Sequence, residues 1–185
     1  MSLLSLLATT TPFPIPTKEI APGVNMPVLM IGTGKSHNYE VVNIVKGWMA
    51  LGGRGVDSAW NYLDQQAVAS TIAAAGVKRS DVFLTSKIPG CPNASATKSY
   101  VQQDLQQLNT TWLDLMLIHY PEPSGCDATW QTLAELHDAG TLKAVGVSNF
   151  KVSDLKQLSG KTTPAVNQIH YSVYQHDEEA IKYNA

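Results

Sequence analysis

Four ionisable side chains of different chemical types stand at the ends of three successive apolar runs. Asp57 and Tyr62 follow the first run, Lys87 ends the second and His119 ends the third. If the runs are parallel strands, their carboxyl ends share one rim of the sheet, where α/β folds carry out chemistry. A carboxylate, a phenol, an ammonium and an imidazole on one rim can hold and transfer a proton. The spacing therefore predicts a single proton-handling site built from these four side chains.

Each of the four also has a structural interpretation when it is taken alone. Asp57 can cap the helix that follows it, and Tyr62 can be a half-buried core aromatic. Lys87 can lie in a solvated loop, and His119 can be a hydrogen-bonded structural histidine. All four residues lie at strand ends. Four unrelated structural roles would not place them there together, so the shared position favours the catalytic interpretation.

The rest of the chain alternates strands with helices. The predicted strands cover residues 27–31, 54–57, 82–86, 113–118, 142–147 and 164–168. Apolar residues at helical spacing, followed by glycine stops, predict helices over residues 39–51, 64–75, 96–108, 127–139 and 151–159, with a last helix starting near Asp177. Strands that alternate with helices form a parallel sheet with right-handed crossovers.

The first residues differ in character from the rest. Residues 1–19 contain Pro12, Pro14 and Pro16 and are expected to form a flexible lead-in to a domain that covers residues 20–185. Pro22-Gly23 is a turn signal and predicts a small hairpin over residues 20–26.

Two parallel architectures compete, a doubly wound open sheet and an eight-fold barrel. A doubly wound nucleotide-binding protein carries Gly-x-Gly-x-x-Gly after its first strand. Here the sequence Gly-Thr-Gly-Lys-Ser-His follows at residues 32–37, which lacks the third glycine and also lacks the spacing of a phosphate-binding loop. The barrel is therefore the favoured architecture.

Composition limits the classes of partner. A net charge of −2 over 185 residues gives no support for binding nucleic acid or a membrane surface. The two cysteines, Cys91 and Cys126, make neither a disulfide framework nor a metal site, so we expect no metal and a reducing, cytoplasmic compartment. Both cysteines fall in loops that border the predicted site, where they are expected to be bystanders.

Five segments together resemble the aldo-keto reductases, which are (β/α)8-barrel oxidoreductases that use a nicotinamide cofactor, usually NADPH. The segments are Gly-Val-Asp-Ser-Ala-Trp-Asn-Tyr (55–62), Asp-Val-Phe-Leu-Thr-Ser-Lys (81–87), Leu-Asp-Leu-Met-Leu-Ile-His-Tyr-Pro (113–121), Gly-Val-Ser-Asn-Phe (146–150) and Pro-Ala-Val-Asn-Gln-Ile (164–169). The resemblance implies a TIM barrel that reduces aldehydes or ketones with NADPH, or with NADH, as the source of hydride.

The resemblance also implies roles for individual residues. Asp57, Tyr62, Lys87 and His119 would be catalytic, with Tyr62 giving its proton to the carbonyl oxygen. Lys87 would lower the pKa of that phenol, Asp57 would balance the charge of Lys87, and a neutral His119 would orient the carbonyl. The cofactor-binding residues would be Gly32, Thr33, Asp57, Ser148, Asn149 and Gln168.

Chain length departs from the resemblance. A complete barrel takes about 250 residues and eight strands, whereas this chain supplies six β/α units. We therefore expect an incomplete barrel, truncated after its sixth strand, that acts on a small carbonyl compound. A monomer is expected if the barrel is complete. The alternative is a fragment that binds the dinucleotide poorly, is weakly active or inactive, and has a binding or regulatory role.

Overall fold

The computed structural model describes residues 15–34, 37–123 and 125–184. The first fourteen residues of the predicted lead-in therefore lie outside the described residues. Strand β1 (Thr17–Ala21) begins inside the segment 1–19 and pairs antiparallel with β2 (Val24–Pro27). Gly23 forms the turn with a φ of 75°, so the predicted hairpin is confirmed. Among the described helices, none is long and apolar enough to cross a membrane.

The predicted strand over residues 27–31 is wrong in extent. The hairpin takes up Pro27 at the end of β2, and only Ile31–Gly32 form strand β3 of the main sheet. Between them Val28 and Leu29 are 61% and 57% exposed, and the amide of Val28 bonds to the carbonyl of Pro16 at 2.9 Å. The apolar run therefore links two sheets instead of forming one buried strand.

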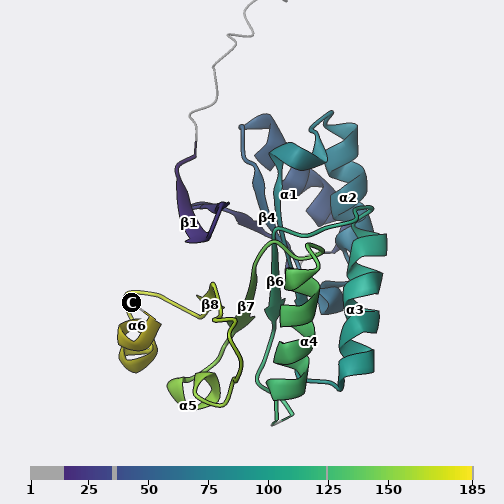
Figure 1. The fold of residues 1–185 in the computed structure, drawn as a ribbon. Coiled ribbons are helices and arrows are strands. Elements are labelled where there is room, and N and C mark those ends of the chain that lie inside the picture. The colour runs from purple at the N-terminus through teal and green to yellow at the C-terminus, as the bar shows by residue number, and fades with distance from the viewer. Residues whose placement is uncertain (1–14, 35–36, 124, 185) are drawn as a thin grey trace, which may run out of the picture.

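Six strands form one parallel sheet in the order β3-β4-β5-β6-β7-β8, so each strand pairs with the next along the chain. After β3 they are β4 (Gly55–Asp57), β5 (Phe83–Ile88), β6 (Leu115–Ile118), β7 (Val145–Ser148) and β8 (Asn167–Gln168). The sheet curls as an incomplete (β/α)8 barrel, as predicted (Figure 1).

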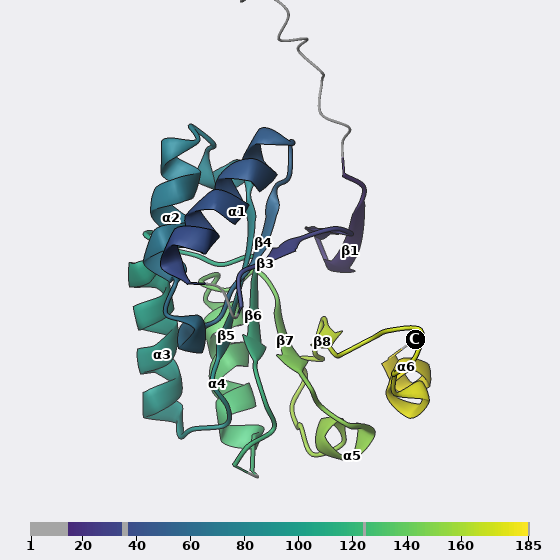
Figure 2. The ribbon, with the colours of Figure 1, turned by 180° about the vertical axis from the view of Figure 1, so that it is seen from behind.

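Four long helices cover the outer face of this sheet, and the hairpin lies on the opposite side (Figure 2). They are α1 (Asn38–Ala50), α2 (Gln65–Ala74), α3 (Ala94–Gln107) and α4 (Asp127–Asp138). The short helices α5 (Val152–Leu155) and α6 (Glu178–Asn184) follow β7 and β8 and contact each other.

The helix predicted over residues 151–159 is wrong in length, because α5 ends at Leu155. Ser159 donates its amide and its hydroxyl to Asp127 Oδ1 at 2.9 and 2.8 Å. These bonds draw the chain toward the start of α4, and Gly160, with a φ of 100°, completes the turn. A tertiary contact therefore ends the helix before its sequence pattern does.

Alternation along the strands separates two apolar clusters. Leu84, Met116 and Val147 face the helices in the larger cluster, together with residues of α1 to α4. Phe83, Leu115 and Leu117 face the other way and pack with Val24 of the hairpin in the smaller cluster. Successive side chains in a strand point to opposite faces. Residues that lie an even number of positions from Phe83 or Leu115 in the same strand therefore face the barrel interior.

Candidate active site

The predicted catalytic residues lie on that interior face. Lys87 stands four positions after Phe83 in β5, and His119 stands four positions after Leu115, just past β6. Asp57 ends β4 two positions after Gly55, which pairs with Phe83. An even offset keeps a side chain on the same face of a strand. The structure therefore brings the three together at the carboxyl ends of neighbouring strands.

Lys87 is a buried cation held by two oxygen atoms. Its side chain is 1% exposed, and Nζ donates to Asp57 Oδ1 at 2.7 Å and to the Ser58 carbonyl at 2.9 Å. Burial lowers the pKa of Lys87, because it disfavours the charged form, and the carboxylate of Asp57 opposes that shift. The predicted counter-charge for Lys87 is thus in contact with it.

Tyr62 lies beside this pair in a short 3-10 helix, Trp60–Tyr62. Its ring meets the His119 ring edge to face, with centroids 5.7 Å apart, and Lys87 Nζ lies 5.3 Å from the ring centroid. A β-carbon added to Gly34 would lie 2.8 Å from Tyr62 Cζ, so glycine at this position leaves room for the phenol where it stands. All four predicted catalytic side chains therefore form one cluster.

The predicted effect of Lys87 on Tyr62 is wrong for this structure. Burial, and after it the negative charge of Asp57, raise the pKa of Tyr62 to about 12. The reason is geometric, because the ammonium group of Lys87 is directed at Asp57 and the Ser58 carbonyl. Tyr62 is consequently protonated at neutral pH and can act as a proton donor.

His119 is buried and neutral. It is 6% exposed, and its Nδ1 has no hydrogen-bond partner among the residues that the structure describes. Burial, followed by the positive charge of Lys87, lowers the pKa of His119 to about 4. The ring of Tyr120 stacks on the imidazole with centroids 4.6 Å apart. A neutral imidazole in this place can donate a hydrogen bond to an incoming oxygen.

The residues predicted to bind the cofactor border this cluster. Gly32 pairs with Asp57 between β3 and β4, and Thr33, which is buried, bonds through its amide to the Asp57 carbonyl at 3.0 Å. Gln168 Nε2 donates to Asp57 Oδ2 at 3.2 Å. Both ends of the sheet therefore converge on Asp57.

Ser148 and Asn149 complete the rim at the end of β7. The Ser148 hydroxyl donates to the Gln168 carbonyl at 2.9 Å, and Asn149 Nδ2 donates to the His119 carbonyl at 2.9 Å. Asn149 adopts a left-handed conformation with a φ of 61°, which asparagine tolerates better than most residues. Through these bonds, and a bond from Asn149 Nδ2 to the Ser148 hydroxyl, the two residues connect the backbone of Gln168 to the backbone of His119.

Sequence reasoning missed two polar neighbours of the cluster. The Ser58 hydroxyl donates to Asp64 Oδ1 at 2.7 Å, while the Ser58 carbonyl accepts from Lys87. Asp64 is 1% exposed and also raises the pKa of Tyr62. Its place two residues after Tyr62 was the available signal, but a helix start was sufficient to explain an aspartate there.

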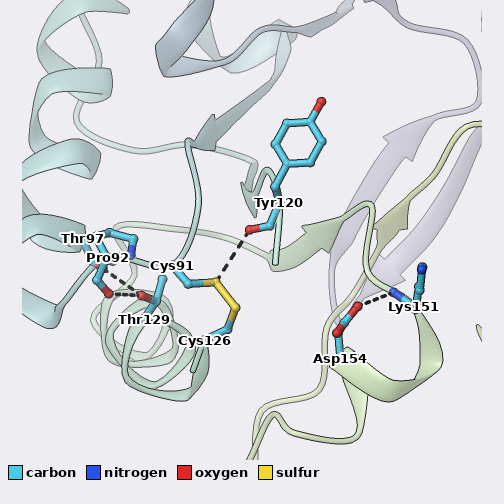
Figure 3. The surroundings of a disulfide bond; sticks show 8 residues. All are labelled: Cys91, Pro92, Thr97, Tyr120, Cys126, Thr129, Lys151 and Asp154. Atoms are coloured by element: carbon cyan, nitrogen blue, oxygen red, sulfur yellow. Dashed lines mark hydrogen bonds between the residues drawn. A yellow bond between two sulfur atoms is a disulfide. The ribbon is translucent and has the colours of Figure 1, made fainter. Parts of the chain in front are cut away.

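The expectation for the cysteines is wrong. Cys91 and Cys126 form a disulfide with Cα atoms 4.8 Å apart, and it joins the loop after β5 to the start of α4 (Figure 3). Their loops follow neighbouring strands, which brings them together although 35 positions separate them. The number of cysteines does not indicate this disulfide. The predicted order of the strands does, because it places the loops that carry Cys91 and Cys126 side by side.

Comparison with known proteins finds relatives that are reductases of one family. A model of the aldo/keto reductase family matches residues 28–184. The chain is 33% identical over 159 residues to a glyoxal reductase of Bacillus subtilis, covering 84% of this chain and 58% of that protein. It is 31% identical over 165 residues to a methylglyoxal reductase of Salmonella typhimurium, covering 86% and 59%. It therefore spans less than two thirds of the length of these relatives.

Solved structures show the same likeness. An aldo/keto reductase from Brucella melitensis superposes with a TM-score of 0.86 at 33% identity, covering 92% of this chain and 69% of that one. An aldose reductase from Giardia lamblia superposes with a TM-score of 0.77 at 25% identity, covering 83% and 61%. Both likenesses extend over most of the present chain.

Proposed function

This chain belongs to the aldo/keto reductase family, and we propose that it is an NADPH-dependent reductase of small aldehydes and ketones. The observation that carries the proposal is the cluster at the rim of the half-barrel. There the Tyr62 phenol contacts the His119 ring edge to face, and Lys87 is bonded to Asp57 at 2.7 Å. Such a cluster can give a proton to an oxygen on which negative charge develops.

The polar groups around Asp57 suit a nicotinamide cofactor. When bound, such a cofactor supplies the hydride. Ser148, Asn149 and Gln168 offer hydroxyl and amide groups of the kind that pair with a neutral carboxamide, and the exposed Gly32 lets a ring approach the backbone beside Thr33. The buried and unpartnered Nδ1 of His119, within the described part of the chain, is a further polar group at this rim. NADPH is our choice of cofactor, and NADH is the alternative.

Each protein group then has one task. Tyr62 holds a proton at neutral pH and gives it to the carbonyl oxygen, because its pKa is raised to about 12. Lys87 is bonded to Asp57 at 2.7 Å and balances the charge of that carboxylate beside the phenol. His119, with its pKa lowered to about 4, stays neutral and orients the carbonyl by a hydrogen bond.

The names of the relatives suggest the substrate class. The matched proteins are named glyoxal reductase, methylglyoxal reductase and aldehyde reductase. We therefore propose small carbonyl compounds, with methylglyoxal as the first to assay. We also propose a cytoplasmic location, where small thiols would keep the Cys91–Cys126 pair in exchange with its reduced form.

Replacing Tyr62 with phenylalanine tests the proton donor. We expect Tyr62→Phe to lower kcat for methylglyoxal reduction by about a hundredfold or more, since general acid catalysis contributes on that order. NADPH oxidation followed at its absorbance band gives the rate. Tyr174→Phe is the matched control, because Tyr174 is 97% exposed and should leave the rate unchanged.

Cofactor affinity separates the reductase from the alternative of a binding or regulatory fragment. We expect quenching of protein fluorescence by NADPH to give a dissociation constant in the low micromolar range or tighter. A folded protein without turnover and without measurable NADPH binding would reject the reductase. Turnover that survives Tyr62→Phe would reject Tyr62 as the donor and retain the activity.

A further inference from the structure

We propose that the Cys91–Cys126 disulfide is a site of reversible thiol–disulfide exchange that fixes residues 120–123 beside His119. The bond lies where the loop after β5 meets the start of α4 (Figure 3). The Tyr120 carbonyl faces the sulfur atoms, and its phenol ring points away from them. The disulfide thus occupies the rim of the barrel, close to the candidate proton-transfer groups.

A small thiol can reach the bond from one side. An open pocket of about 230 Å³ is lined by residues 89–92 together with Tyr100, Glu122 and Pro123. Cys91 belongs to the wall of this pocket, and Cys126 does not. Access from the pocket therefore favours attack at Cys91, although Cys91 and Cys126 are similarly buried, at 6% and 7% exposed.

The other sulfur is the better leaving group. Cys126 is the N-cap residue of α4, a helix of twelve residues. A helix N-terminus stabilises a thiolate, and a stabilised thiolate leaves faster. Attack on Cys91 therefore forms a mixed disulfide there and releases Cys126 as the thiolate.

The exchange balances with a dithiol as reductant. The second sulfur of the dithiol attacks the mixed disulfide, forms a disulfide within the reductant and releases Cys91 as a thiolate. The protein gains two electrons and, once both thiolates are protonated, two protons, and the dithiol is oxidised by the same amount. Oxidised glutathione, a disulfide, reverses the reaction.

The disulfide connects to the candidate site through Tyr120. Cys91 Sγ lies 3.7 Å from the Tyr120 carbonyl oxygen, a packing contact because a disulfide sulfur carries no hydrogen to donate. The Cys91 amide donates to the Glu122 carbonyl at 2.8 Å. The ring of Tyr120 in turn stacks on His119 at 4.6 Å. Residues 120–123 are thereby held on one side by the cysteines and contact the imidazole on the other.

Reduction should leave the fold in place. Thr129 in α4 bonds to the Pro92 carbonyl and lies 3.4 Å from the Thr97 hydroxyl, so α4 stays attached to the loop after β5. Ile88 and Ile118 pair across β5 and β6 just before the two loops. The expected change is therefore confined to residues 120–123 and to the groups that they contact.

Nuclear magnetic resonance of the whole chain tests the proposal without any need for turnover. The protein is first equilibrated with oxidised glutathione and then with dithiothreitol, and alkylation of the undenatured protein counts its free thiols at each stage. The reporters are hydrogen exchange at the amide of Cys91 and the imidazole signals of His119. The amide of Val147, bonded to Val166 at 2.8 Å, and the imidazole of His137 are internal controls. The Cys91→Ser/Cys126→Ser variant is the chemical control.

We expect no free thiol after glutathione and two after dithiothreitol. Exchange at the Cys91 amide should then be faster by about tenfold, because the segment would open locally at a lower free energy. The His119 signals should shift, while both internal controls and the variant stay unchanged. The effect on substrate binding rests on the proposed function and would appear as a change in KM with kcat nearly constant.

Three results would overturn the proposal. Free thiols that persist in oxidised glutathione would mean that the bond does not form. Thiols released only after denaturation would mean that the bond is permanent. Complete reduction with unchanged exchange at Cys91 and unchanged His119 signals would mean that the bond does not hold residues 120–123. An inactive enzyme that still shows the expected changes would reject the reductase activity alone.

Discussion

Asp64 gives the candidate site a second carboxylate close to the buried ammonium of Lys87. Its Oδ1 accepts from the Ser58 hydroxyl at 2.7 Å, and its buried Oδ2 has no partner within residues 15–34, 37–123 and 125–184. After burial, Asp57 and Tyr120, it is a further cause of the raised pKa of Tyr62. Asp64 therefore makes the phenol a weaker acid than burial and Asp57 alone would.

Asp64→Asn should lower the pKa of Tyr62 from about 12 toward its ordinary value of 10.0. Removing a negative charge favours the phenolate, and the amide oxygen can still accept from Ser58. Titration of tyrosinate absorbance, with the Tyr62→Phe version of each protein subtracted, gives the pKa. Asp81→Asn, which removes an exposed carboxylate, is the control and should change nothing. An unchanged or higher pKa would show that Asp64 has no electrostatic effect on Tyr62.

Helices α2 and α3 meet strand β5 through a buried polar ring. Gln65 Nε2 donates to Asp104 Oδ1 at 2.6 Å, and the Ser86 hydroxyl lies 2.7 Å from Asp104 Oδ2 and 3.1 Å from Gln65 Oε1. One hydroxyl hydrogen cannot serve both oxygens. A protonated Asp104 resolves this, because it can donate to Ser86 while Ser86 donates to Gln65. Burial raises the pKa of Asp104 to about 7, which agrees with that arrangement.

Asp104→Asn should make unfolding less dependent on pH. The folded protein keeps a proton that the unfolded chain loses above a pKa of 3.8, so wild-type stability falls as pH rises from about 4 to about 7. An asparagine amide can donate to Ser86 at every pH. We expect the variant to be more stable at alkaline pH by about 1 kcal/mol, the scale of one buried hydrogen bond.

Urea unfolding at several pH values measures this prediction for the Asp104 variant. Asp138→Asn, at an exposed position of α4, should retain the wild-type slope. A variant that is less stable than the wild type at alkaline pH would show that the ionised carboxylate is the better partner for Gln65 and Ser86.

Strand and helix positions could be predicted because they depend on local periodicity. Asp57, Lys87 and His119 could be assigned to one rim for the same reason, since each follows a strand whose end is visible in the sequence. The early end of α5 could not be predicted, and neither could the division of residues 27–31 between β2 and β3, because each depends on contacts with distant residues. Likewise, no spacing rule indicates that Lys87 Nζ is directed at Asp57 and the Ser58 carbonyl.

Across the whole molecule, the disulfide closes a loop between residues 35 positions apart. Such a closure restricts the unfolded chain and should stabilise the folded protein by about 4 kcal/mol. Guanidinium unfolding of the oxidised protein and of the Cys91→Ser/Cys126→Ser variant should differ by that amount. Equal midpoints would show that the bond contributes to local order without global stability.

The order of the six strands has a consequence for synthesis. Every strand of the sheet from β4 to β8 joins the strand made just before it. A growing polypeptide can therefore extend the sheet one β/α unit at a time as it leaves the ribosome, without waiting for a distant partner. Asp57, Lys87 and His119 would enter their cluster in that sequence, so the charge of Lys87 would find its carboxylate already present.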